Sequence, residues 1–120
     1  MAAPGQDLPV LVIGAGPTGL AAALELARHG RAVRIVDQLP TRSEHSKAIG
    51  INARTLELME ASGVTERLLA RGLRLRRFHF RSGERLRATV ELARVNHRYN
   101  FMLALLQAET ERILEQRLAE

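Results

Sequence analysis

A six-residue glycine pattern near the N-terminus, Gly14–Gly19 (GAGPTG), constrains the fold of this chain more than any other feature. It fits G-x-G-x-x-G and lies between a short apolar run, Pro9–Ile13, and a stretch with apolar residues at helical spacing, Leu20–His29. A strand that leads through a tight glycine turn into a helix is the dinucleotide-binding arrangement. Because the β-branched segment Ala32–Asp37 then predicts a second strand, we expect a Rossmann-like βαβ unit and an α/β fold.

Five of the six residues of the pattern have a physical role in this interpretation. Gly14 permits the sharp turn, Gly16 leaves room for a pyrophosphate, and Gly19 lets the helix pack close to the strand. Pro17 and Thr18 belong to the first helical turn, whose N–H groups attract phosphate. Asp37 follows at the expected spacing of about twenty residues, where a carboxylate accepts hydrogen bonds from a ribose diol and repels a 2′-phosphate. We therefore predict an ADP-type dinucleotide, with NADP disfavoured.

The middle of the chain predicts two helices and a hairpin. Asn52 is expected to cap a helix over Ala53–Ser62, and Gly63 to end it. In Leu73–Arg81 the apolar phase slips by one residue at Arg76–Arg77, which predicts a β-bulge. The other expected elements are a helix over Val64–Arg71 ending at Gly72, a turn at Ser82–Glu84, a strand over Arg85–Leu92, a loop at 93–100, a strand or helix over Phe101–Leu106 and a helix over Gln107–Leu118.

Composition excludes several classes of function. The chain has no cysteine and therefore no disulfide scaffold or thiolate metal site, which suits a reducing cytoplasm. No apolar run is long enough for a membrane helix, and the four histidines share no metal-ligand spacing. We therefore predict no metal site and name no catalytic residue.

The net charge of +5 reflects arginines gathered between Arg71 and Arg98, which we interpret as a solvated sheet face, with nucleic-acid binding as the alternative.

FAD and NAD share the ADP half, so the glycine pattern does not separate them. A typical NAD domain continues to a third buried parallel strand, whereas residues 38–52 contain none and an arginine-faced hairpin follows later. This departure favours FAD. An NAD-binding oxidoreductase fragment and a non-catalytic nucleotide-binding or interaction module stay open as alternatives.

The chain resembles the N-terminal part of the FAD-dependent aromatic hydroxylases, the para-hydroxybenzoate and phenol hydroxylase-like flavoprotein monooxygenases. The resemblance runs from Val10 to Leu118 through VLVIGAGPTGLAAALELARHG, VRIVD, SKAIGINARTLELMEASGV and QAETERIL. It implies FAD as cofactor, with Asp37 and the adjacent Gln38 at the adenosine ribose and Gln107 at the ribityl–phosphate region. It also implies phosphate or adenosine contacts from Arg42, Lys47 and Ala48. Relatives commonly carry arginine in place of Lys47, and proline where Leu106 stands.

The same resemblance implies that the chain is incomplete. Relatives carry further Asp-Gly and Gly-Asp motifs, and this sequence contains neither dipeptide. We expect residues 1–8 to be a flexible leader and 9–120 to be the N-terminal portion of an FAD-binding domain, inactive alone and able to self-associate through exposed sheet edges. The full-length enzyme would hydroxylate a small aromatic substrate with O₂ and NAD(P)H.

Overall fold

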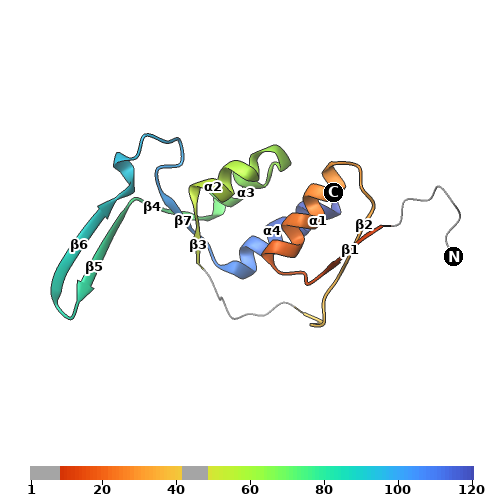
Figure 1. The fold of residues 1–120 in the computed structure, drawn as a ribbon, viewed down its shortest axis with the longest axis horizontal. Helices are drawn as coiled ribbons and strands as arrows, with labels where there is room; N and C mark the ends of the chain where they lie inside the picture. Colours follow the sequence, from red (N-terminus) through yellow and green to blue (C-terminus); the bar gives the residue numbers. More distant parts are fainter. Residues whose placement is uncertain (1–8, 42–48) are drawn as a thin grey trace, which may run out of the picture. The chain divides into compact units, whose positions relative to one another are not determined.

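The structure, a computed structural model, describes residues 9–41 and 49–120, which form two compact units (Figure 1). The first unit is discontinuous in sequence and joins residues 9–41 to 107–120, whereas the second is the continuous stretch 49–106. The expected site residues Arg42, Lys47 and Ala48 lie outside the described residues, as does the expected leader at 1–8.

The first unit contains the predicted βαβ arrangement. Strand β1 (Val10–Ile13) leads into helix α1 (Pro17–Arg28), which returns to strand β2 (Val33–Val36). The two strands pair in parallel, with β1 aligned residue for residue along β2. Gly30 has φ +72° and ends the helix in the left-handed conformation, as predicted. The βαβ prediction is therefore confirmed.

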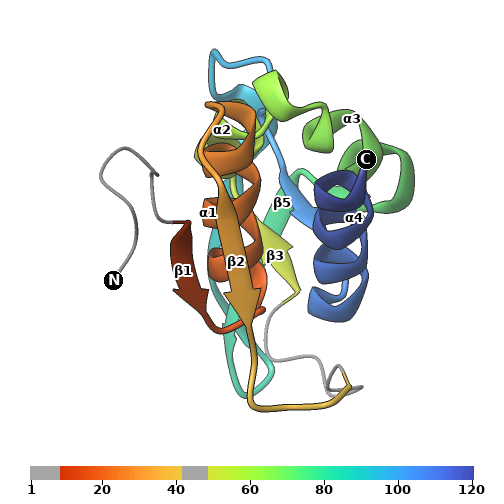
Figure 2. The ribbon, with the colours of Figure 1, turned by 90° about the vertical axis from the view of Figure 1, so that its right-hand side faces the viewer.

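Helix α4 (Gln107–Ala119) packs against α1 in the same unit. The buried residues of α1 are Leu20, Ala23 and Leu24, and Ile113 and Leu114 are buried on α4. Both helices begin at the end of the unit where β1 and β2 finish (Figure 2). This end therefore gathers two helix N-termini and two strand C-termini.

The second unit begins with short helices and a small antiparallel sheet. The helical elements are α2 (Ala53–Leu58), the 3₁₀ turn η1 (Glu60–Ser62) and α3 (Val64–Arg71). Asn52 Oδ1 accepts the Thr55 N–H at 2.9 Å, which confirms the predicted cap. The single helix expected over Ala53–Ser62 is interrupted after Leu58, because the chain tightens into the 3₁₀ turn before Gly63 reverses it with φ +75°.

The sheet of this unit has the strand order β3–β7–β4. Its strands are β3 (Gly50–Ile51), β4 (Leu73–Leu75) and β7 (Met102–Ala104), and both outer strands run antiparallel to β7. The segment that the sequence left open between strand and helix is thus a central strand. Leu103 on this strand is fully buried, and so are Leu56, Val64 and Leu68 from the helices.

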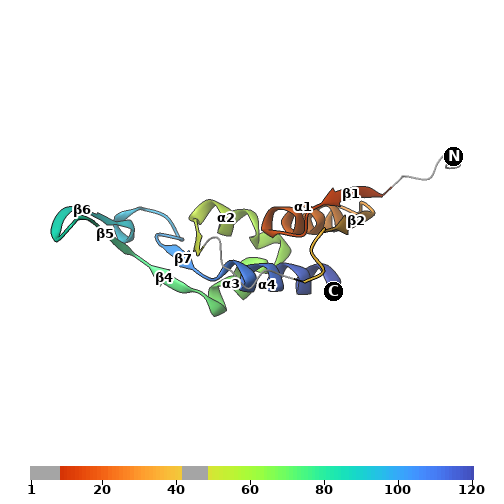
Figure 3. The ribbon, with the colours of Figure 1, turned by 90° about the horizontal axis from the view of Figure 1, so that it is seen from below.

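Strands β5 (Arg77–Ser82) and β6 (Arg85–Glu91) form the predicted hairpin, with Gly83 at φ +57° in its turn. The bulge expected at Arg76–Arg77 is wrong: β4 and β5 belong to different sheets, and the register shift lies between Phe80 and Arg81. Leaving one sheet for another shifts the apolar alternation just as a bulge does. The hairpin extends away from the three-stranded sheet (Figure 3), and its apolar residues Phe80 and Leu86 remain exposed.

A 3₁₀ turn, η2 (Leu92–Arg94), follows β6 and opens the loop that leads to β7. Across residues 9–41 and 49–120, no helix combines the length and the apolar character needed to cross a bilayer.

Candidate functional site

The glycine turn of the first unit requires glycine at its ends for two different reasons. Gly14 has φ +104°, a conformation that side chains strain, and its N–H donates to Val36 O at 2.7 Å. A Cβ on Gly19 would lie 1.8 Å from Gly14 O, so that α1 approaches the turn more closely than alanine allows. A Cβ on Gly16, in contrast, would meet nothing within 4 Å. The fold therefore leaves open space in front of Gly16.

The N-terminus of α1 has no side-chain cap. Gly16 is the N-cap residue, Pro17 is at the first helical position, and the first turn contains no acidic residue. Thr18 and Gly19 have no intrahelical acceptor for their N–H groups at this position of a helix. The positive end of the helix dipole is therefore available to an anion, and no carboxylate of the first turn competes for it.

Asp37 follows β2 and ties its end to the glycine turn. Its Oδ2 accepts the Ala15 N–H at 2.7 Å, and its Oδ1 accepts the Leu39 N–H at 2.8 Å. The hydrogen bond from Leu39, and next that from Ala15, lowers the pKa of Asp37 below its ordinary value. Each carboxylate oxygen has a second lone pair, so that the exposed, charged group can still accept from a ribose diol. The sequence predicted this acceptor but not its bond to the turn.

Gln38 is exposed directly after Asp37. Gln107 is the first residue of α4, and α4 begins at the same end of the unit as the glycine turn (Figure 2). Its side-chain Nε2 donates to Glu111 Oε1 at 2.8 Å. Sequence reasoning did not identify Glu111, which is buried; its spacing of one helical turn from Gln107 is the signal that could have identified it.

The described residues of this end fit the ADP half of a dinucleotide. They combine open space at Gly16, an uncapped helix N-terminus and a charged acceptor at Asp37, and the first two suit a pyrophosphate while the third suits a ribose. In the part of the chain that the structure describes, no group of three or more histidines and carboxylates is placed to hold a metal ion.

Comparison with known families identifies a match to the FAD binding domain over residues 7–120. The chain is 41% identical over 115 residues to pentachlorophenol 4-monooxygenase of Sphingobium chlorophenolicum, covering 93% of this chain and 21% of that protein. It is 39% identical over 119 residues to 6-methylpretetramide 4-monooxygenase of Streptomyces rimosus, covering 97% and 21%. The chain thus spans about a fifth of the length of these curated relatives.

Solved structures give the same result. The structure of p-nitrophenol 4-monooxygenase from Pseudomonas putida superposes with a TM-score of 0.86 at 25% identity, covering 92% of this chain and 29% of that one. The anhydrotetracycline hydroxylase of Streptomyces rimosus superposes with a TM-score of 0.79 at 32% identity, covering 92% and 22%. The α/β fold expected from the sequence is therefore confirmed, and it corresponds to less than a third of each of these two solved chains.

Proposed function

Because the chain belongs to the FAD binding domain family of flavin-dependent aromatic monooxygenases, with FAD as cofactor, we propose that the end of the first unit described above holds the ADP half of FAD. The observation that carries this assignment is the open space at Gly16 in front of the uncapped N-terminus of α1. The pyrophosphate would lie against Gly14, Gly16 and Gly19 and the first helical turn at Pro17 and Thr18.

The adenosine ribose would be held by Asp37, with Gln38 beside it. Since Asp37 carries a lowered pKa, it is charged at neutral pH and disfavours the extra phosphate of NADP at this position. Gln107 is assigned to the ribityl–phosphate region, where Glu111 orients its amide through the hydrogen bond described above. Arg42, Lys47 and Ala48 complete the proposed set at the phosphates and adenosine.

The whole protein that contains such a domain is proposed to hydroxylate a small aromatic substrate with O₂ and NAD(P)H. When bound, FAD would supply the redox chemistry, which no side chain of this chain can supply. The residues of this chain bind and orient the cofactor, and none of them is assigned as acid, base or nucleophile. The 120-residue chain alone is therefore expected to be inactive in hydroxylation.

Binding titrations with FAD, FMN and NAD test this assignment. We expect FAD to bind, ADP to compete with it, and FMN, which lacks the ADP half, to bind more weakly by about tenfold or more. Gly16→Val should abolish FAD binding, whereas Ala22→Val, which places a valine at an exposed position of α1, should not. Equal affinity for FMN, or FAD binding by the Gly16→Val chain, would contradict it. A preference for NAD over FAD would support the alternative of an NAD-dependent oxidoreductase.

The arginine-rich hairpin is proposed to be a solvated face that does not bind nucleic acid. Arg77 pairs with Glu91 at 2.8 Å, and Arg81 donates to the Glu84 carbonyl at 3.0 Å. The ion pair offsets one positive charge of the hairpin, and the hydrogen bond engages the guanidinium group of a second arginine. RNA or DNA binding at low salt that weakens steeply as salt is added would contradict the proposal.

We place the protein in the cytoplasm, because a chain without cysteine suits a reducing compartment.

Self-association is proposed through the open edges of the two-stranded β1–β2 sheet. Sedimentation at increasing concentration tests it, and a monomer throughout would exclude it.

A further inference from the structure

A pocket of about 260 Å³ lies in the second unit. Its apolar wall is formed by Leu92 of η2, Val95 of the loop that follows, and Phe101 and Met102 at the start of β7, with Ala53 of α2 completing it. None of these residues belongs to the glycine turn or to the residues proposed to hold FAD. The pocket is therefore a feature that the proposed function does not use.

The two asparagines of the lining already have partners within the protein. Asn52 Oδ1 accepts from Thr55 as the cap of α2, and Asn100 Nδ2 donates to Ala93 O at 3.2 Å. Both asparagine side chains are thus hydrogen-bonded to backbone groups of the protein. The asparagine groups that could orient a polar ligand are thus partly occupied.

The other two polar side chains of the lining, His97 and Tyr99, are held by a pair of glutamates. The Tyr99 N–H donates to His97 Nδ1 at 3.0 Å, so that His97 Nε2 carries the proton and donates to Glu57 Oε1 at 2.8 Å. The Tyr99 hydroxyl donates to Glu60. This hydrogen bond, and next burial, raises the pKa of Tyr99, which stays protonated. Both side chains are thus held in place by the protein, and each glutamate is also paired with an arginine, Glu57 with Arg54 at 3.2 Å and Glu60 with Arg98.

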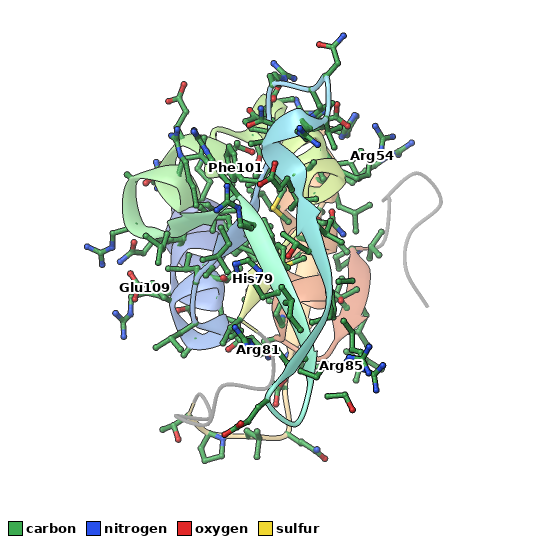
Figure 4. All side chains as sticks on the ribbon, turned by 90° about the vertical axis from the view of Figure 1, so that its left-hand side faces the viewer. Arg54, His79, Arg81, Arg85, Phe101 and Glu109 are labelled. Atoms are coloured by element: carbon green, nitrogen blue, oxygen red, sulfur yellow. The ribbon has the colours of Figure 1, made fainter. Side chains whose placement is uncertain are left out.

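Of the aromatic rings of the lining, Tyr99 and Phe101 are arranged edge to face, and His97 is tilted against Tyr99. The Tyr99 and Phe101 ring centroids are 6.0 Å apart at 81°, and the His97 and Tyr99 rings are 6.0 Å apart at 54°. The Arg74 guanidinium lies 5.1 Å from the Phe101 ring centroid, so that this ring is fixed from a further direction. Phe101, which is buried, lies at the base of the hairpin, away from Arg81 and Arg85 (Figure 4). One more ring could extend such a cluster with the same preferred geometry.

We propose that this pocket binds a small, uncharged, single-ring aromatic molecule, as a ligand site separate from the FAD site. A dry apolar cavity of about 150 Å³ accommodates benzene, so that 260 Å³ suits one ring with a small substituent. The polar lining groups are largely engaged by the protein and most of the wall is apolar, so that a carboxylate would lose much of its hydration on entering the pocket. An uncharged ring is therefore preferred over its carboxylate-bearing analogue. The inference requires neither FAD nor oxygen chemistry.

The chain provides its own probe for the test. Tyr99 is the only tyrosine and there is no tryptophan, so that intrinsic fluorescence reports on the pocket alone. The 120-residue chain is titrated with 4-fluorotoluene and, separately, with 4-fluorobenzoate, and both Tyr99 emission and the ¹⁹F resonance of the probe are followed. We expect saturable binding of fluorotoluene and weaker binding of fluorobenzoate by about tenfold or more.

Variants locate the binding. Ala53→Leu should fill the pocket and weaken fluorotoluene binding by about tenfold or more, whereas Ala70→Leu, which adds the same bulk at an exposed position of α3, should leave it unchanged. If Ala53→Leu does not fold by circular dichroism, Val95→Phe serves instead, because Val95 is 52% exposed and tolerates a larger side chain.

Three results would overturn the proposal: no saturable binding of fluorotoluene, fluorobenzoate binding as tightly, or binding that the pocket-filling variant does not weaken. A change of Tyr99 emission with protein concentration that the pocket-filling variant abolishes would show that a second copy fills the pocket, and would also overturn the proposal. The FAD-site variant Gly16→Val should leave fluorotoluene binding intact, so that failure of the FAD assignment is recognised separately.

Discussion

Replacing Gly16 and Gly19 one at a time by alanine should separate cofactor binding from folding. Gly16 has φ −74° and ψ −177°, which alanine adopts readily, and its Cβ would meet nothing within 4 Å. The Gly16→Ala chain should therefore keep its stability or gain about 0.4–1 kcal/mol through a less flexible unfolded state. Its new methyl group occupies the space through which a pyrophosphate approaches, so that FAD affinity should fall.

Gly19→Ala should instead destabilise the folded chain. Alanine is favoured over glycine within a helix by about 1 kcal/mol. Its Cβ, however, would lie 1.8 Å from Gly14 O and 3.3 Å from Val12 Cγ1, so that backbone must move. Overpacking of this kind costs about 1–3 kcal/mol, and a backbone clash belongs at the upper end. The net effect should be a loss of about 1–2 kcal/mol, and the two variants should differ by about 2 kcal/mol.

Urea denaturation followed by circular dichroism, without FAD, measures this difference, and an FAD titration of the same samples measures binding. Gly16→Ala should be folded with weakened binding, whereas Gly19→Ala should unfold at lower urea concentration. A Gly19→Ala chain as stable as Gly16→Ala would show that the turn is not sterically limited as described. FAD binding by Gly16→Ala at parental affinity would show that the pyrophosphate does not approach this residue.

Three further predictions concern other parts of the chain. Asn52→Ala removes the cap of α2 and should lower the free energy of unfolding by about 1 kcal/mol, with Asn52→Asp close to the parent in urea denaturation. Gly72→Ala would place a Cβ 2.5 Å from Leu103 Cγ and should destabilise by about 1–3 kcal/mol, and a double-mutant cycle with Leu103→Ala should show that the two costs are not additive. Because the pKa of Asp37 is lowered in the folded chain, its contribution to stability is present above pH 3.8 and is lost as the pH falls through the folded pKa. An Asp37→Asn chain should have a shallower decline of the urea midpoint with acid, and an unchanged decline would exclude this contribution.

The parts of the fold that depend on short-range chemistry could be predicted from the sequence. The glycine turn, the Asn52 cap and the reversals at Gly30, Gly63 and Gly83 follow from residue types that have few alternatives in those positions. The parallel pairing of β1 and β2 follows because a helix of this length connects them.

The parts that depend on distant partners could not be predicted. The change of sheet at Arg76 is decided by β7, whose residues are far along the chain, and the two-residue strand β3 is too short to leave a pattern of its own. The exposure of the apolar residues of the hairpin could not be predicted either. The alternation of apolar and polar residues shows which side chains share a face of the sheet, but not whether another element covers that face.

For the candidate site, the sequence identified the residue types but not all of their contacts. The bond from Ala15 to Asp37 requires that the carboxyl ends of β1 and β2 meet, and this is a property of the sheet. The aromatic pocket combines residues of α2 with the loop before β7 and has no local signature.

The discontinuity of the first unit affects the order in which the chain can assemble during synthesis. Helix α1 leaves the ribosome early, but its partner α4 begins only at Gln107, after the whole continuous stretch 49–106 has emerged. Until then the apolar face of α1 has no α4 to pack against. The entropy of closing that long loop grows only slowly with its length, and the intervening residues can fold meanwhile as a unit of their own. Of the two units, the first is thus the earlier to begin translation and the later to be completed.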